Sequence, residues 1–131
     1  MVFLEYRIIY YRNARNGRVP AKEFLEALET RRRYKVRAYI DLLRERGGYL
    51  DEPYARHISG GVRELRVDFS KHRHRIFYFT AIGKRIILLH AFYKKSPKTP
   101  SSEIARAMNN YNDFMASDEG GTNHFLTYNG L

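Results

Sequence analysis

The sequence predicts an α+β domain, a small antiparallel sheet with helices packed on one face. Residues 62–69, 73–81 and 85–93 form three successive runs of strand length that are rich in β-branched and aromatic side chains. Apolar side chains recur at helical spacing through residues 20–46. A strand-like segment precedes these helices and a further helical segment follows the third run. The predicted order is therefore β-α-α-β-β-β-α, with the second face of the sheet left for a ligand.

The N-terminal part of the chain begins with a strand and continues with helices. Residues 3–11 (FLEYRIIYY) combine β-branched and aromatic side chains, which favours a strand. Pro20 suits the first helical position, where a missing N–H costs nothing. Thr30 is a plausible N-cap of a second helix, and Gly47 with Gly48 ends it. We interpret residues 20–46 as a helical hairpin, although one long helix has the same apolar pattern.

The three strands follow an irregular connection over residues 48–61, where Pro53 and the Gly60–Gly61 pair act as breakers. Residues 82–84 make the turn between the second and third strands. The third strand contains the nearly continuous apolar run IILLHAF, which is typical of a strand covered on both faces.

The last predicted helix begins around Thr99 and Pro100, which suit an N-cap and a first turn. From Ser117 onward the sequence shows no helical or strand period. We therefore expect one domain over residues 1–116 and a flexible tail over residues 117–131.

The composition is strongly basic. There are 24 Lys and Arg against 14 Asp and Glu, a formal net charge of +10, which predicts attraction to nucleic acid, an acidic partner or an anionic surface. The lack of cysteine excludes a disulfide framework and a thiolate metal site. No long apolar run opens the chain, so we expect neither a signal peptide nor a membrane span, and a cytoplasmic location.

The positive charge is concentrated in the predicted strands. Residues 62–98 contain ten Lys or Arg and only two acids, Glu64 and Asp68, whereas no Lys or Arg follows Arg106. A sheet with this balance is suited to binding phosphates. A second basic run lies on the predicted helices, where a solvated face is the usual meaning and a second phosphate-contacting surface is the alternative. Its members are Arg31, Arg32, Arg33, Lys35 and Arg37.

The motifs of several enzyme classes are missing. There is no Gly-rich phosphate loop, H-E-x-x-H motif or close cluster of carboxylates. The five histidines lack the spacing of a metal site, so we expect no metal and no cofactor. RNA cleavage can proceed without either, because the 2′-hydroxyl next to the scissile phosphate is an internal nucleophile. DNA lacks this hydroxyl, so these residues favour RNA as the substrate.

Side-chain alternation places arginines and acids together. Glu64, Arg66 and Asp68 share one face of their strand, and Arg73 and Arg75 share one face of the next. Arginine suits phosphate because its planar fork holds two oxygens and keeps its charge. The alternative for Arg66 and Arg75 is structural, since either can pair with an acid and only hold the sheet.

Other candidates lie on and after the third strand. Lys94 and Lys95 follow one another, so they point to opposite sides and at most one faces a substrate. A lysine whose pKa is lowered by neighbouring cations can act as a general base, and Lys98 can grip a backbone phosphate. His90 is a candidate for proton transfer, as is His57, although a histidine within an apolar strand is more often a core residue.

The segments RELR (residues 63–66), HRIFYF, IILLHAF and KKSPKTP, followed by SSEIARA, occur here in one order. Together with the upstream VPAKEFLEAL, LLRERG and HISGG segments, they resemble the HigB-type branch of the RelE/ParE toxins over roughly residues 3–116. These proteins are the toxin halves of bacterial and phage toxin–antitoxin pairs. The resemblance implies a RelE-like fold and an endoribonuclease that cleaves mRNA on the ribosome, without a metal, to inhibit translation. It also implies a cognate antitoxin, expected to be of the helix-turn-helix type.

The resemblance implies that Arg66 and Arg75, the two arginines of the motif, bind phosphate. It does not say whether Lys94 or Lys95 faces the RNA. The expected catalytic set is Arg66, Arg75, Lys94, Lys95 and His90. The expected RNA-binding set is Arg63, Arg73, Lys98 and Tyr93. Two alternatives stay open: a ParE-like toxin that poisons DNA gyrase without cutting RNA, and a nucleic-acid-binding module without catalysis.

Overall fold

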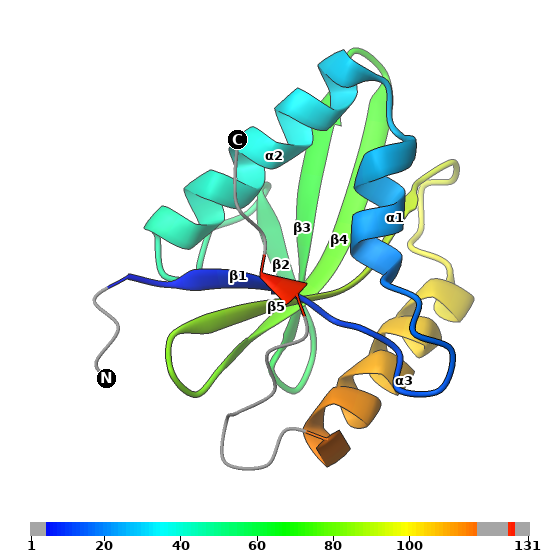
Figure 1. Cartoon of the computed structure of the whole chain (residues 1–131). Helices are drawn as coiled ribbons and strands as arrows, with labels where there is room; N and C mark the ends of the chain where they lie inside the picture. Colours follow the sequence, from blue (N-terminus) through cyan, green and yellow to red (C-terminus); the bar gives the residue numbers. More distant parts are fainter. Residues whose placement is uncertain (1–4, 118–125, 128–131) are drawn as a thin grey trace.

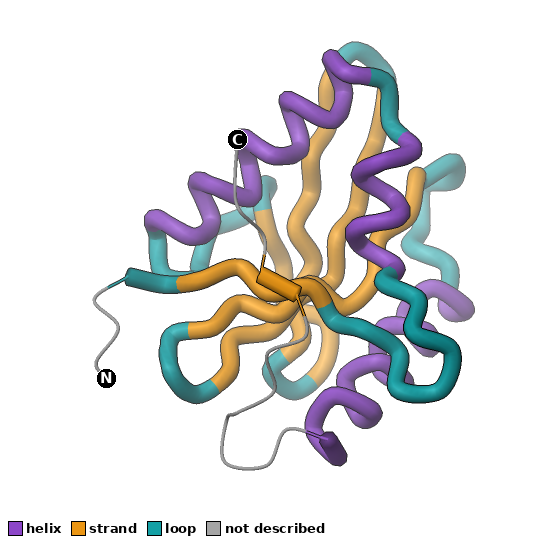
Figure 2. The backbone as a smooth tube through the Cα atoms, in the orientation of Figure 1, coloured by secondary structure: helices purple, strands orange, loops and turns teal. Residues whose placement is uncertain are grey.

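A six-stranded sheet with the strand order β2-β3-β4-β5-β1-β6 forms the centre of the molecule (Figures 1 and 2). The computed structural model describes residues 5–117 and 126–127. The strands are β1 (Arg7–Tyr10), β2 (Ala55–Ser59), β3 (Val62–Phe69), β4 (His72–Ala81), β5 (Arg85–Tyr93) and β6 (Leu126–Thr127). The helices are α1 (Pro20–Ala27), α2 (Thr30–Glu45) and α3 (Ser101–Ser117).

The predicted meander is confirmed as β3, β4 and β5, which pair antiparallel in sequence order. Only the start of β4 differs, by one residue, from the predicted bounds. β1 lies on the other side of β5 and runs parallel to it, with Arg7 opposite Arg85 and Tyr10 opposite Leu88. The first strand of the chain therefore lies inside the sheet, and its parallel pairing depends on the crossover that the intervening elements provide.

Helices cover both faces of the sheet, which corrects the expectation that they share one face. α1 and α2 pack on the face that includes Ile8 and Tyr78, whereas α3 packs on the face that includes Ile9 and Phe79. Figure 1 shows α3 on the opposite side of the sheet from α1 and α2. The reason is that β1 and β5 are apolar on both sides, so each face of these strands needs its own cover. The α+β class itself is confirmed.

The helical hairpin is also confirmed. Leu28 and Glu29 have extended backbones with ψ of 146° and 157°, and they separate α1 from α2. Pro20 is the first residue of α1, as its missing N–H predicts. Within the described ranges, no helix is long and apolar enough to cross a membrane.

Two short strands depart from the sequence-based expectation. β2 lies inside the connection predicted to be irregular and pairs with β3 through a register shift between His57 and Ser59. Most of its side chains are exposed, so no apolar period marks it in the sequence. β6 pairs Leu126 and Thr127 with β1, within the segment predicted to be a flexible tail. The rest of that tail beyond Ser117, and residues 3 and 4 of the predicted first strand, lie outside the described residues.

Gly48 joins α2 to the sheet at a place where no side chain fits. Its φ is +88°, and an added Cβ would lie 2.5 Å from the Thr80 Oγ1. Its carbonyl accepts a hydrogen bond from the Tyr78 hydroxyl at 3.2 Å, which fixes the backbone against β4. Both the left-handed φ and the close contact therefore require glycine.

Gly48→Ala is expected to lower the free energy of unfolding by about 1–3 kcal/mol, because the new methyl group forces both backbone strain and displacement of Thr80. Urea denaturation measures the change. The matched control is Gly61→Ala, whose added Cβ meets nothing within 4 Å. The control is expected to change stability by less than about 0.5 kcal/mol. Equal losses in the two variants would contradict the packing argument.

Candidate functional site

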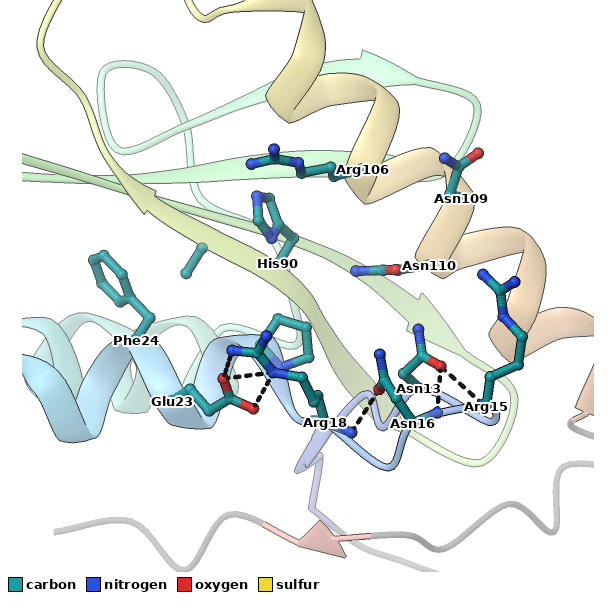
Figure 3. Close-up of a pocket in the computed structure, with 12 residues that line it drawn as sticks. Asn13, Arg15, Asn16, Arg18, Glu23, Phe24, His90, Arg106, Asn109 and Asn110 are labelled. Atoms are coloured by element: carbon teal, nitrogen blue, oxygen red, sulfur yellow. Dashed lines mark hydrogen bonds and ion pairs between the residues drawn. The ribbon is translucent and has the colours of Figure 1, made fainter.

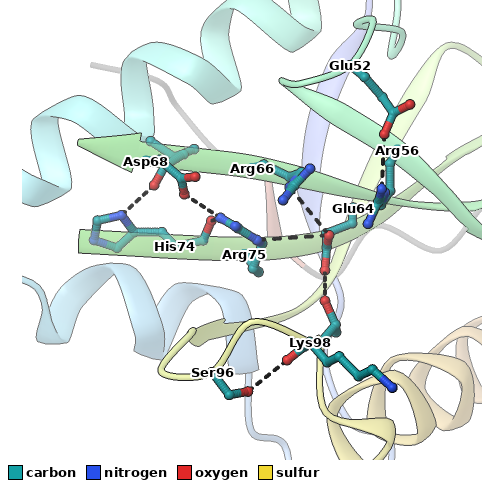
Figure 4. A network of polar contacts seen from close by, with 11 residues as sticks. Glu52, Arg56, Glu64, Arg66, Asp68, His74, Arg75, Ser96 and Lys98 are labelled. Carbon is teal, nitrogen blue, oxygen red and sulfur yellow. Dashed lines mark hydrogen bonds and ion pairs between the residues drawn. The ribbon is translucent and has the colours of Figure 1, made fainter. Parts of the chain in front are cut away.

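The face of the sheet that carries α3 is polar where the helix does not cover it. Arg66 on β3 lies directly opposite Arg75 on β4, so the two arginines share one face of the sheet. Glu64 lies on the same face of β3, and Lys94 follows the end of β5. Figure 4 shows Glu64, Arg66, Arg75 and Asp68 in one network on neighbouring strands. The two arginines of the sequence motif are thus brought together with both acids of the meander.

Glu64 lies at the centre of this network. Its residue is only 1% exposed, and its Oε1 lies 3.9 Å from the Nε of both Arg66 and Arg75. Its Oε2 accepts a hydrogen bond from the Thr99 hydroxyl at 3.1 Å, which ties the loop after β5 to the sheet. A buried carboxylate is stable only when it is paired, and here two guanidinium groups and a hydroxyl surround it.

Arg75 is held by protein groups and does not reach the surface. Its side chain is 1% exposed, and its Nη1 lies 2.5 Å from the Asp68 Oδ1 and 3.0 Å from the His74 carbonyl oxygen. This arrangement agrees with the structural alternative for Arg75. Arg66 is more accessible, because 22% of its side chain is exposed. The Nε–H groups of both arginines are buried and donate to no hydrogen-bond acceptor among the described residues.

A pocket of about 420 Å³ opens beside Arg66. Four cationic residues line it, namely Arg56, Arg66, Lys94 and Lys98. None of the described residues that line it is acidic. The lining residues are Arg56, His57, Ile58, Arg66, Lys94, Pro97, Lys98, Thr99 and Ile104. We call it the cationic pocket. It gathers β2, β3 and the loop after β5, and an anion that enters it meets side-chain donors from all three.

Lys94, and not Lys95, belongs to the cationic pocket. The Lys94 residue is 7% exposed and its backbone N–H donates to the Arg73 carbonyl at 2.8 Å, whereas Lys95 is exposed to solvent. Burial lowers the pKa of Lys94, and the nearby Arg75 and Arg66 lower it further, although Glu64 acts in the opposite direction. The structure thus distinguishes the two lysines.

Two of the predicted RNA-binding residues lie on the other face of the sheet. Arg63 donates to the Tyr78 hydroxyl at 3.3 Å and to the Leu50 carbonyl at 3.3 Å. Tyr93 lies beneath Arg32, whose guanidinium carbon is 5.1 Å from the ring centroid. Along their strands, both residues alternate with residues whose side chains lie on the α3 face of the sheet. Their own side chains therefore point toward α1 and α2. Arg73 shares a face with Asp68 but is exposed outside the cationic pocket.

His90 is separated from the cationic pocket. Its ring stacks on Phe77 and Phe92 at interplanar angles of 5° and 18°, and its Nε2 lies 3.1 Å from the Glu103 Oε1. These contacts hold the start of α3 against the sheet. His57 lines the cationic pocket instead, with its Nε2 2.8 Å from the Gly60 carbonyl oxygen.

Arg56 is the residue that sequence reasoning missed. It lies on β2 opposite Glu64 of β3, so the unexpected strand brings it to the cationic pocket. The alternation of exposed residues in ARHIS was too short to reveal a strand.

The basic run on α2 is partly used in packing. Arg32 Nε donates to His74 Nε2 at 3.1 Å, and burial lowers the pKa of His74.

Glu64→Gln is expected to lower the free energy of unfolding by about 3 kcal/mol, because it leaves the buried Arg75 without one of its two acidic partners. The control is Asp68→Asn, which removes the other acid. Asp68 is 53% exposed, so water screens and replaces its interaction, and a loss of about 1 kcal/mol or less is expected. Urea denaturation of both variants compares them. A larger loss for Asp68→Asn would show that Glu64 is not the central partner.

Comparison with known proteins places the chain in a family. The sequence profile of the Phage derived protein Gp49-like family (DUF891) matches residues 23–112, which is more than half of the chain. The matched span contains every residue that lines the cationic pocket. A search of curated proteins finds no match. The Gp49-like family is related to the RelE-type toxins, so the broader part of the resemblance is supported. The chain belongs to the Gp49-like family of phage-derived proteins.

Proposed function

We propose that this protein is a HigB-type toxin, an endoribonuclease that cleaves mRNA on the ribosome without a metal and is silenced by a cognate antitoxin. The observation that carries the proposal is the cationic pocket. Four Lys or Arg line it with no acidic lining residue among those described, while Glu64 lies buried behind them. A concave surface of this charge favours a phosphate group, and the relation of the family to RelE-type toxins favours RNA as its source.

The reaction begins with attack of the RNA 2′-hydroxyl on the adjacent phosphorus atom. Arg66 and Lys98 hold the non-bridging oxygens, where negative charge increases in the transition state. Lys94 takes the proton of the 2′-hydroxyl. Its lowered pKa makes a neutral amine more available than an ordinary lysine would provide. Lys94 therefore acts as the general base in this mechanism.

Cleavage is completed at the leaving group. As the bond from the 2′-oxygen to phosphorus forms, the bond from phosphorus to the 5′-oxygen breaks. His57, the histidine of the cationic pocket, donates a proton to that 5′-oxygen. The products are a 2′,3′-cyclic phosphate and a free 5′-hydroxyl, so the proton taken by Lys94 is balanced by the proton that His57 gives.

Arg75 has a positioning role in this scheme. It is buried behind Arg66, and it shares the carboxylate of Glu64 with that residue. Its charge also lowers the pKa of Lys94. The partner follows from the same charges, because an acidic antitoxin segment over the cationic pocket neutralises it and excludes RNA. An antitoxin of the helix-turn-helix type and a cytoplasmic site of action belong to the proposal.

Lys94→Ala is expected to slow single-turnover mRNA cleavage by about 10²–10³-fold, because the general base is lost. Primer extension on mRNA incubated with translating ribosomes and saturating protein measures the rate. Lys95→Ala is the matched control, since it removes the same charge from the neighbouring exposed position. It is expected to cleave near the wild-type rate.

Equal losses in the two lysine variants would mean that charge alone accounts for the effect, and Lys94 would not be the base. Gyrase-dependent DNA breaks without RNA cleavage would replace the proposal with a ParE-like activity. Retained cleavage in the presence of EDTA is the expected result for a reaction that needs no metal.

The pH dependence of cleavage provides a separate test of Lys94. A general base works when deprotonated, so the rate is expected to rise with pH until it passes the lowered pKa of Lys94. Glu64 raises that pKa, so Glu64→Gln is expected to move the rising limb to lower pH in the protein that remains folded. Lys94→Arg is expected to lose this limb. If the rise of the rate with pH persists in Lys94→Arg, the titrating group is another residue.

A further inference from the structure

A second cavity, of about 680 Å³, lies on the other side of α3 from the cationic pocket and shares no lining residue with it. It exists because β1 stops pairing with β5 at Leu88, and the chain then leaves through residues 11–19 toward α1. The later part of β5 is therefore flanked by α1 and that loop on one side and by α3 on the other. This volume is in the range of small-ligand sites.

The walls of this cavity, which we call the amide cleft, are rich in asparagine and arginine. Figure 3 shows the amide groups of Asn13, Asn16 and Asn110 directed toward the space between α1 and α3. Asn109, His90 and three arginines also belong to the polar lining, and Glu23 is the one acid among the described lining residues. The arginines are Arg15, Arg18 and Arg106.

The amides are held in fixed orientations. The Asn13 Oδ1 accepts from the backbone N–H groups of Arg15 and Asn16 at 2.8 and 3.1 Å, and the Asn16 Oδ1 accepts from Arg18 N–H at 2.9 Å. Their NH₂ groups are thereby left as donors toward the cleft. Asn110 Nδ2 donates to the Leu89 carbonyl at 2.8 Å, which leaves its Oδ1 as an acceptor.

The loop that carries these donors is fastened to α3. The Tyr11 hydroxyl lies 2.5 Å from the Asp113 Oδ2, and the Ala14 N–H donates to the same oxygen at 3.2 Å. The two walls of the amide cleft are therefore held at a set distance without a ligand. Preorganised donors and acceptors favour recognition of a flat polar group such as the edge of a nucleobase.

The arginines supply the complementary charge. Arg18 pairs with Glu23 at 2.5 Å and Arg106 with Glu103 at 3.0 Å, and both side chains are mostly exposed. The guanidinium group of Arg15 has neither a hydrogen bond nor an ion pair among the described residues. It is thus the cation of the cleft with its donors most available for a phosphate.

We propose that the amide cleft binds one nucleotide of a single-stranded RNA, with the phosphate on Arg15 and the base edge on the asparagine amides. The site is an accessory to the cationic pocket and gives the protein a base preference away from the cleaved bond. The inference rests on the proposed function in taking RNA as the ligand, and it requires no cleavage.

The test uses the full chain and five probes: the four ribonucleoside 5′-monophosphates and inorganic phosphate. Titration calorimetry measures affinity, and ¹⁵N–¹H spectra follow the side-chain NH₂ signals of the asparagines. At least one nucleotide is expected to bind about tenfold more tightly than inorganic phosphate, with shifts in the signals of Asn13, Asn16 and Asn109. Equal binding of phosphate and all four nucleotides would overturn base recognition.

Two variants separate the parts of the ligand. Arg15→Ala is expected to weaken every probe about tenfold, whereas Asn109→Ala is expected to weaken nucleotides and spare inorganic phosphate. Arg46→Ala removes an exposed cation outside the cleft and is expected to bind like the wild type. A loss in Arg46→Ala equal to that in Arg15→Ala would overturn the proposal, because it would reduce the effect to net charge.

The site and the cleavage activity can fail independently. Nucleotide binding that survives Arg15→Ala but is lost in an Arg66→Ala, Lys94→Ala double variant would place the nucleotide in the cationic pocket and overturn the proposal. A tetraglutamate peptide that binds more tightly than any nucleotide, and loses affinity in Arg15→Ala, would make the cleft a protein-docking site instead. Nucleotide binding in the amide cleft would stand even if no mRNA were cleaved.

Discussion

The cationic pocket depends on the burial of one carboxylate between two guanidinium groups. Glu64 lies between Arg66 and Arg75 and lowers the electrostatic cost of bringing both arginines close to Lys94. Because the acid is beneath the surface, the pocket wall itself remains cationic and available to an anion. The same carboxylate accepts a hydrogen bond from Thr99, so the loop that carries Lys94 is held at the sheet. A buried ion network of this kind contributes less to stability than to placing charges.

The position of α3 decides where this network can reach solvent. Its apolar stripe covers the part of the face formed by residues such as Phe79 and Leu89, and among the described residues Ile104 is its one contribution to the lining of the cationic pocket. The contact between His90 and Glu103 and the bond between Thr99 and Glu64 fix the start of the helix on either side. A helix on this face thus does not block the ligand site and instead forms its border.

The two cavities on either side of α3 relate differently to the Gp49-like family. Every lining residue of the cationic pocket falls within the matched span of residues 23–112. The amide cleft takes part of its lining, including Asn13, Arg15 and Asn16, from the loop before that span. The pocket thus lies in the part of the chain that matches the family, and the cleft lies partly outside it.

The sequence by itself determined the three-stranded meander and the face of its strand on which each of Arg66 and Arg75 lies, and it favoured a helical hairpin over one long helix, because these depend on local period and on turns a few residues long. Only the tertiary structure decided that α3 covers the second face, that β2 carries Arg56 to the pocket, and that Lys94 rather than Lys95 lines it. These features depend on contacts between distant segments, and β2 has too little apolar pattern to be recognised alone. The burial that distinguishes Arg75 from Arg66 likewise arises from neighbouring strands and from Asp68, which a single strand pattern does not contain.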